Sequence, residues 1–231
     1  MNMARLARAV IPGIAVHATQ RGNHRQTVFF GDEDRKIYLG LLHKNARRYG
    51  VSILGYCLMS NHTHLVVIPH CDFSLSRALG QTNMEYARWV QVPRDTPGHL
   101  WQARFRSCLL SDTHLWAALR YVELNPVRAR MVRSAEEWPW SSASSHLRGM
   151  AEERFLAMDL WRERWSPEQW RVALAESLQE ADWQTRLREA TRTGRPFGET
   201  AFLEQVGAEL GRNFKPMTRG PKGKPAAASM F

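Results

Sequence analysis

Residues 51–69, VSILGYCLMSNHTHLVVIP, decide the fold class of this chain. They hold two apolar runs, VSILGYCLM and THLVVIP, which are joined by the short connection SNH. Two apolar strands joined this closely predict a β-hairpin. Pro69 ends the second strand, because proline has no backbone N–H to donate to the ladder.

Further elements are predicted on both sides of this hairpin. Strands are predicted over residues 14–19, 28–30 and 100–110, where apolar and β-branched residues lie between turn signals. Capping residues and helical spacing predict helices over residues 32–49, 74–91 and 112–124, the first ended by Gly50 and the last by Pro126. This order predicts an α+β domain, with a central antiparallel sheet and the helices segregated to one side.

The composition narrows the class of protein. The chain has 231 residues and 44% hydrophobic residues, and it contains no stretch of the roughly 20 apolar residues that a membrane span needs. The N-terminal apolar run is broken by Pro12 and Gly13, so it predicts a first strand and no signal peptide. Cys57, Cys71 and Cys108 have neither disulfide nor zinc-site spacing. We therefore expect a cytoplasmic, nucleoid-associated protein with no membrane partner.

Charge is distributed unevenly along the chain. Residues 1–150 hold 19 Lys/Arg against 10 Asp/Glu, residues 151–210 hold 8 against 12, and residues 211–231 hold 5 against none. A domain that concentrates arginine in this way is typical of proteins that bind nucleic acid. The change in composition predicts a catalytic domain over residues 1–148, a helical extension over 149–210 whose tryptophans are core residues, and a basic flexible tail over 211–231.

His62 and His64 flank one residue at the start of the second hairpin strand. Side chains two positions apart on a strand point to the same face, so both imidazoles converge on one point. Such a pair can hold a metal ion from a rigid element. An H-x-H pair also occurs by chance, and the spacing alone leaves both interpretations open.

Two tyrosines are candidate nucleophiles. Tyr121 lies near the end of the helix predicted over residues 112–124, and Asn125 follows on the same helical face. A tyrosine hydroxyl can attack a phosphodiester if a metal or a base assists it. Tyr86, on the preceding predicted helix, is a rival, and either tyrosine could instead be a core residue.

Five segments together resemble one family. In chain order they are HATQRGNHRQTVFF (17–30), GYCLMSNHTHLVVIP (55–69), GHLWQARFRS (98–107), RYVELNPVRARMV (120–132) and WPWSS (138–142). Their order and spacing resemble the REP-associated tyrosine transposases, which belong to the HUH superfamily of single-strand transposases. Residue 63 is threonine, where the motif name implies a bulky apolar residue. A threonine still suits a strand, and its side chain would point away from the metal.

The resemblance implies an HUH nuclease fold with a definite site. His62 and His64 would bind Mg²⁺ or Mn²⁺, Tyr121 would be the nucleophile instead of Tyr86, and Asn125 would complete the metal site. The enzyme would cleave and rejoin single-stranded DNA beside a palindromic, REP-like hairpin through a 5′-phosphotyrosine, as a monomer or homodimer. No nucleotide cofactor is expected, because the chain contains no GxxxxGK[ST] motif.

The expected DNA contacts are basic residues on three segments of the chain. They are Arg21, His24, Arg25, Arg104, Arg106, Arg120, Arg128 and Arg130. Two other functions remain open at this stage. One is a hairpin-binding protein that derives from a transposase and does not cleave, and the other is a metal-dependent hydrolase in which water replaces the tyrosine.

Overall fold

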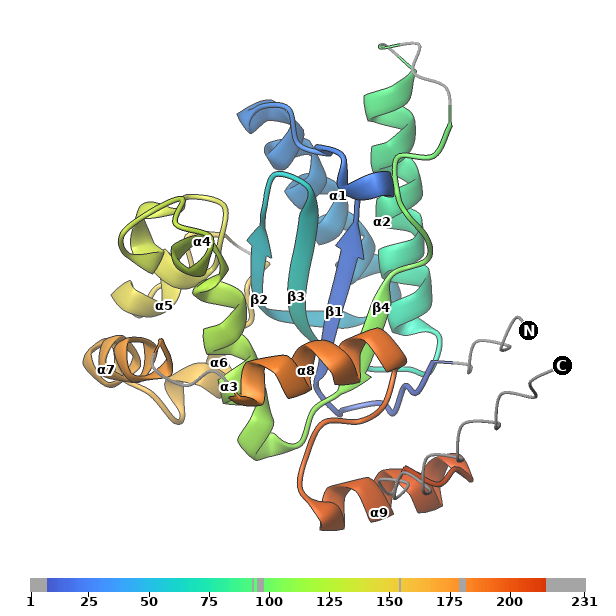
Figure 1. Ribbon diagram of the computed structural model, residues 1–231, viewed down its shortest axis with the longest axis vertical. Coiled ribbons are helices and arrows are strands. Elements are labelled where there is room, and N and C mark those ends of the chain that lie inside the picture. The colour runs from blue at the N-terminus through green and yellow to red at the C-terminus, as the bar shows by residue number, and fades with distance from the viewer. Residues whose placement is uncertain (1–7, 93, 95–97, 154, 179–181, 215–231) are drawn as a thin grey trace, which may run out of the picture.

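An antiparallel sheet forms the centre of the molecule. The computed structural model in Figure 1 describes residues 8–92, 94, 98–153, 155–178 and 182–214. Within these residues four strands pair in the order β2-β3-β1-β4, each pair antiparallel. The strands are β1 (Val16–Arg21), β2 (Val51–Leu58), β3 (His62–Pro69) and β4 (Arg106–Leu109). The predicted α+β class is confirmed.

The predicted hairpin is the pair β2 and β3. Its turn is closed by the backbone N–H of Met59, which donates to the carbonyl of His62 at 2.9 Å. The register shifts once, between Ile53 and Gly55. A Cβ at Gly55 would lie 2.1 Å from Cδ1 of Leu119 on helix α3 (Asp112–Glu123). Glycine at this position therefore allows α3 to lie directly on the sheet.

Helices α1 (Asp32–Tyr49) and α2 (Ser74–Gln91) cover one face of the sheet and lie behind it in Figure 1. Both span the residues predicted for them, and Gly50 ends α1 with a left-handed φ of 67°. Their shared core includes Tyr38 and Tyr86, whose ring centroids are 5.2 Å apart. This face of the sheet is closed by apolar packing.

Helices α3 and α8 (Asp182–Thr193) cover the opposite face, and α8 crosses in front of β1 and β4 in Figure 1. The prediction that the helices lie to one side is therefore wrong. The reason is visible in the strands: nearly every residue of β2 and β3 is buried, whichever way its side chain points. Strands that are apolar on both faces need cover on both faces.

The remaining helices pack beside α3. They are α4 (Asn125–Arg128), α5 (Ala143–Arg148), α6 (Asp159–Arg162), α7 (Pro167–Ser177) and α9 (Thr200–Leu210), with short 3-10 turns at Asn23–Arg25 and Ala135–Glu137. The buried carboxylate of Glu123 on α3 joins two of them, α5 and α7. It contacts Nδ1 of His146 at 2.5 Å and accepts hydrogen bonds from Ser142 at 2.6 Å and from Trp170 at 2.9 Å.

The tryptophans Trp161 and Trp170 are buried, which confirms the prediction that they are core residues. Helices α6 to α9 lie within the predicted helical extension, whereas residues 150–153 and 155–158 form no helix, and the division of the chain into domains stays a prediction. Of the predicted basic tail, residues 215–231 lie outside the residues that the structure describes.

Two predicted strands differ from the structure. Residues 28–30 form no strand: the N–H groups of Val28 and Phe29 both donate to the carbonyl of Ser60, and both side chains are buried under the hairpin. The strand predicted over residues 100–110 is reduced to Arg106–Leu109. The preceding residues run irregularly beside the end of β1, where Gln102 donates to the carbonyl of Arg21 at 2.9 Å. Val28 and Phe29 are thus buried without a ladder partner, whereas Phe30 is exposed.

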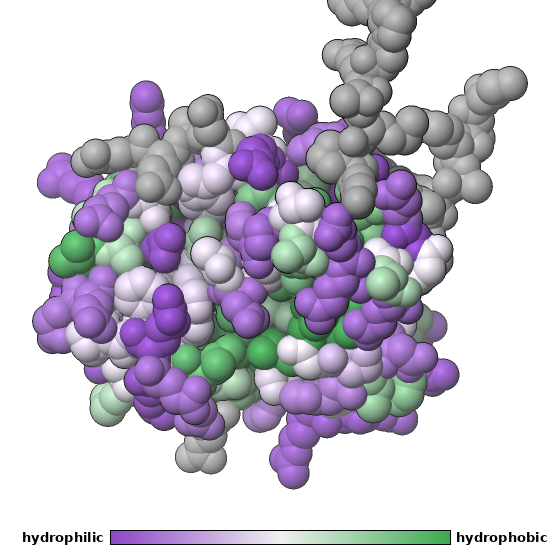
Figure 2. All heavy atoms as spheres, turned by 90° about the horizontal axis from the view of Figure 1, so that it is seen from below, coloured by the Kyte–Doolittle hydropathy of each residue, from purple (hydrophilic) through white to green (hydrophobic). Residues whose placement is uncertain are grey.

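Most side chains on the face seen from below are hydrophilic, with one short apolar band (Figure 2). In the part of the chain that the structure describes, no helix combines the length and apolar character needed to cross a membrane.

Candidate functional site

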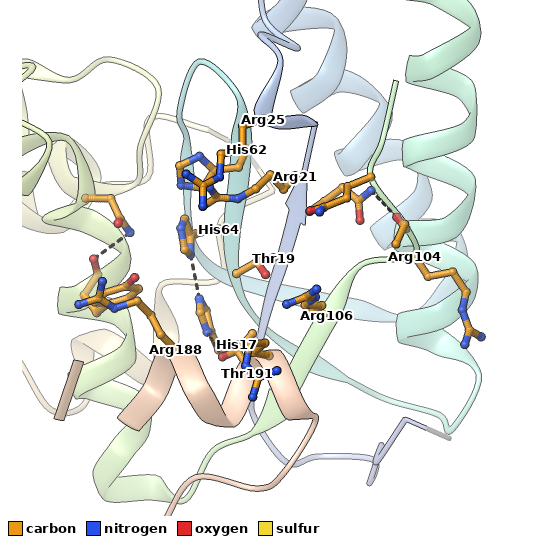
Figure 3. Close-up of a pocket in the computed structure, with 16 residues that line it drawn as sticks. His17, Thr19, Arg21, Arg25, His62, His64, Arg104, Arg106, Arg188 and Thr191 are labelled. Atoms are coloured by element: carbon orange, nitrogen blue, oxygen red, sulfur yellow. Dashed lines mark hydrogen bonds between the residues drawn. The ribbon is translucent and has the colours of Figure 1, made fainter. Parts of the chain in front are cut away.

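A pocket of about 600 Å³ opens on the sheet face that α3 and α8 cover. Residues of β1, β3 and β4 line it, and so do side chains from both helices (Figure 3). The lining residues are His17, Thr19, Gln20, Arg21, Arg25, His62, His64, Gln102, Ala103, Arg104, Arg106, Tyr121, Asn125, Arg188, Thr191 and Arg192. The pocket therefore combines imidazoles, a phenol and several guanidinium groups, and none of its lining residues is acidic.

His62 and His64 lie on the same face of β3, with ring centroids 4.9 Å apart. Nδ1 of His62 lies 2.6 Å from Oδ1 of Asn61, an acceptor only, so this nitrogen carries the proton and Nε2 keeps a lone pair. Burial, with a smaller effect of Arg21, lowers the pKa of His62 to about 4, and burial also lowers the pKa of His64. Both rings are therefore neutral near pH 7, the form that binds metals.

Thr63, between the two histidines, points to the opposite face. Its side chain is buried and hydrogen bonds to the hydroxyl of Tyr38 on α1. The strand alternation thus places a structural residue on the closed face and two imidazoles in the pocket.

A third histidine joins this pair, and the sequence analysis did not select it. His17 on β1 is buried, and its Nε2 lies 3.0 Å from Nδ1 of His64. The two rings lie edge to edge in nearly the same plane, with centroids 5.3 Å apart and planes inclined by 9°. Burial lowers the pKa of His17 to about 3. The available signal was the alternation His17, Thr19, Arg21, which places a histidine on the same face as His64.

Tyr121 faces the histidines from α3. Its ring centroid is 5.6 Å from that of His64 and 5.9 Å from that of His17. Arg128 contacts both the ring and the backbone of Tyr121. Its guanidinium lies 4.3 Å from the ring centroid and donates a hydrogen bond to the Tyr121 carbonyl. Burial raises the pKa of the phenol, and nearby guanidinium groups, first that of Arg128, oppose the shift. The phenol is therefore protonated near pH 7.

The rival Tyr86 lies on the other side of the sheet. It is fully buried, and its hydroxyl donates to the carbonyl of Val28 at 2.6 Å. It does not line the pocket. The geometry therefore separates the two candidate nucleophiles, because the hydroxyl of Tyr86 already has a backbone acceptor within the core.

Asn125 also lines the pocket, immediately after the last turn of α3. Its amide nitrogen donates to the carbonyls of Tyr121 at 3.0 Å and Val122 at 3.2 Å. The nitrogen is thereby engaged, and the amide oxygen is the atom that could serve as a ligand.

The predicted DNA contacts fall into two groups. Arg21, Arg25, Arg104 and Arg106 line the pocket. The other four are elsewhere: His24 and Arg130 are exposed outside it, Arg128 supports Tyr121, and Arg120 donates to Ser177 at 2.6 Å in a separate groove. Arg188 and Arg192 of α8 also line the pocket and were not predicted, because nothing in the local sequence links that helix to the site.

The donor set suits a divalent ion only in part. Among the described residues, no group of three or more His, Cys, Asp or Glu side chains could hold a metal. Two neutral imidazoles and the amide oxygen of Asn125 fit as ligands, and a hard cation such as Mg²⁺ needs further oxygen ligands. Phosphate oxygens of a bound nucleic acid fit this requirement in a pocket so rich in arginine.

Comparisons with known proteins concern the family and the fold of this chain. A family model described as transposase IS200 like matches residues 11–125. The structure of a REP-associated tyrosine transposase bound to a REP hairpin has the same fold: the TM-score is 0.56 at 18% identity, over 64% of this chain and 88% of that one. A putative transposase from Deinococcus radiodurans R1 has a TM-score of 0.38 at 18% identity, over 52% of this chain and 96% of that one. No curated protein matches the chain significantly.

Proposed function

We propose that this chain, whose residues 11–125 match the IS200-like transposase family, cleaves and rejoins single-stranded DNA through a covalent phosphotyrosine at Tyr121. The family resemblance predicted from the sequence is confirmed at this level. The observation that carries the proposal is the position of Tyr121, whose ring faces His64 across an arginine-lined pocket.

Several residues in the pocket or next to it have a part in the proposed reaction. His62, His64 and the amide oxygen of Asn125 would hold Mg²⁺ or Mn²⁺, which when bound would polarise the scissile phosphate. Arg21 and Arg106 would bind phosphate oxygens from the neighbouring strands. Arg128 stacks on the phenol and would hold the ring of Tyr121 in place.

The proposed reaction has two steps, cleavage and rejoining. In the first, the hydroxyl oxygen of Tyr121 attacks the phosphorus, the O–H bond and the bond to the 3′ oxygen break, and a 5′-phosphotyrosine and a free 3′-hydroxyl form. In the second, a 3′-hydroxyl attacks the phosphotyrosine, which restores the diester and the phenol. No nucleotide is consumed, because the tyrosine ester conserves the energy of the bond.

The proposed substrate is a palindromic hairpin with a single-stranded flank. A structural relative with the same fold is bound to a REP hairpin. The pocket of this chain is open, basic and lined by several side chains that can contact a splayed strand. We propose that the hairpin lies outside the pocket and that its flank enters it.

The test is an adduct assay with 5′-labelled and 3′-labelled hairpin oligonucleotides and Mn²⁺. The wild type should form a protein–DNA adduct that carries the 3′ label, and Tyr121→Phe and His64→Ala should form none. Tyr86→Phe is the matched control and should still form the adduct. Cleavage without an adduct that persists in Tyr121→Phe would identify water as the nucleophile, and tight binding without cleavage in any metal would identify a protein that only binds hairpins.

A further inference from the structure

We propose that His17 and Thr191 are positioning residues that hold His64 in a single tautomer, with the proton on Nδ1 and the lone pair of Nε2 turned into the pocket. Thr191 lies on α8, so a helix beyond the family match becomes part of the site. The inference deepens the proposed function, since it assigns which nitrogen of His64 is available to a metal ion.

The hydroxyl of Thr191 acts as a hydrogen-bond acceptor toward His17. This hydroxyl donates its only proton to the carbonyl of Leu187, one turn earlier on α8, at 2.8 Å. Oγ1 must therefore act as an acceptor toward its other partners. One of these is Nδ1 of His17, at 2.8 Å, so the proton of this pair belongs to His17.

The imidazole of His17 carries only one proton. The ring is buried, and none of the residues that line the pocket is acidic, so a second proton on it would be an unpaired buried charge. With Nδ1 protonated, Nε2 of His17 is an acceptor. It lies 3.0 Å from Nδ1 of His64, which must then donate. His64 is left with its lone pair on Nε2.

The pair His62 and Asn61 produces the same result by a different route, because Asn61 Oδ1 accepts from Nδ1 of His62. Both histidines of β3 thus direct Nε2 lone pairs from one face of the strand. Metal-ligating histidines characteristically donate their other ring N–H to a neighbouring group, which fixes the orientation of the ring. For His62 that group is local in sequence, and for His64 it is 47 residues away and is itself held by α8.

Tertiary packing fixes the position of Thr191. Leu187 and Thr191 face the sheet from α8, and both are buried. The chain after α8 is attached to the edge strand, where Phe197 donates to the carbonyl of Leu109 at 2.8 Å. Cys108, on the neighbouring strand β4, also contacts Oγ1 of Thr191, at 3.2 Å. The acceptor for His17 is therefore built into a rigid part of the molecule.

Three substitutions on α8 isolate the hydroxyl. Thr191→Val keeps the shape of the side chain and removes the acceptor, whereas Thr191→Ser keeps the acceptor. Thr193→Val is the matched control, because the hydroxyl of Thr193 donates only to carbonyls of its own helix, those of Glu189 and Ala190. A loss seen with Thr191→Val alone is thus specific to the contact with His17.

The experiment measures imidazole nitrogen NMR spectra of the metal-free full chain with labelled histidines. We expect His17 and His64 of the wild type both to carry the proton on Nδ1. Thr191→Val should convert them to mixed tautomers, and Thr191→Ser and Thr193→Val should not. In a titration with Mn²⁺ alone, followed by electron paramagnetic resonance, Thr191→Val should bind about 10-fold more weakly than Thr193→Val.

The proposal is overturned if wild-type His64 carries its proton on Nε2, a result that needs no variant to fold. It is also overturned if Thr191→Val retains the wild-type tautomers. The same holds if Thr191→Val binds Mn²⁺ as tightly as Thr193→Val does. Neither result depends on cleavage. A wild type that forms no adduct with DNA but shows the expected tautomers would refute the proposed function and leave the positioning of His64 intact.

Discussion

The two faces of the sheet carry similar aromatic clusters with opposite consequences. On the closed face, Tyr38 and Tyr86 pack against Phe29 with centroids 5.4 and 5.3 Å away, and the hydroxyl of Tyr86 donates to a backbone carbonyl. On the open face, Tyr121 packs against His17 and His64 at similar distances, beside a cavity of about 600 Å³. A tyrosine is therefore a candidate nucleophile because of its partners, and burial alone does not distinguish the two.

The largest expected effect is on adduct formation and comes from removing one tyrosine hydroxyl on each face of the sheet. Tyr121→Phe should abolish the covalent adduct and change the free energy of unfolding little, because the Tyr121 hydroxyl has no hydrogen-bond partner among the residues that the structure describes. Tyr86→Phe should retain the adduct and lower the free energy of unfolding by about 1–3 kcal/mol, because the carbonyl of Val28 loses its buried donor. Adduct gels and urea unfolding of both variants measure the contrast. The comparison of the two faces fails if Tyr86→Phe loses the adduct while still folded.

A second prediction concerns the attachment of α3 to the sheet. Gly55→Ala would place a Cβ 2.1 Å from Leu119 and 2.9 Å from Oγ of Ser142. We expect a loss of about 1–3 kcal/mol in the free energy of unfolding, because a packed interface must move apart. Since α3 carries Tyr121, adduct formation should also slow. Gly40→Ala on α1 is the control, since a Cβ there meets nothing within 4 Å. Equal stability of the two variants would contradict the close approach of α3.

The third prediction concerns how the free energy of unfolding depends on pH through the buried histidines of the pocket. The pKa of His17 is lowered to about 3 and that of His62 to about 4, below the usual value of 6.5. Below pH 6.5 the unfolded chain therefore binds protons that the folded chain does not. The stability of the metal-free protein should be full above pH 6.5 and should decline as the pH falls toward about 4.

Urea unfolding at several pH values between about 4 and 6.5 gives the slope of the free energy of unfolding against pH. His17→Gln removes one of the titrating groups from the open face and should make the decline with falling pH shallower than in the wild type. An unchanged slope in this variant would show that His17 is already protonated in the folded protein.

The smallest expected effect concerns single arginines. Arg106→Ala and Arg188→Ala should each weaken binding of a single-stranded oligonucleotide, and each should reduce the magnitude of the salt slope by about 0.7 for every phosphate that the variant no longer neutralises. Arg130→Ala, outside the pocket, is the control and should leave the slope near that of the wild type. Fluorescence anisotropy at several salt concentrations measures the slopes. Equal slopes for all three variants would place the DNA elsewhere.

Local sequence patterns were sufficient to predict the helices and strands that have clear capping residues, helical spacing or apolar runs. The bounds of α1 and α2 follow from capping residues and helical spacing, and β2 and β3 follow from two apolar runs with a short connection. The strand predicted over residues 28–30 was wrong because burial does not require a ladder partner: Val28 and Phe29 both donate to a turn carbonyl instead. The cover on both faces was missed because tertiary contacts, which local patterns do not contain, decide the face on which α3 and α8 pack.

The sequence by itself determined the α+β class, the two histidines on one face of a strand, and the tyrosine segment that the family match includes. Alternation along a strand and spacing along a helix are local properties, so they can be read without a fold. Only the tertiary structure decided that Tyr121 faces His64, that Tyr86 is closed into the core, and that His17 contacts Thr191, 174 residues away. These contacts join distant segments, and their geometry is set by how both faces of the sheet are packed.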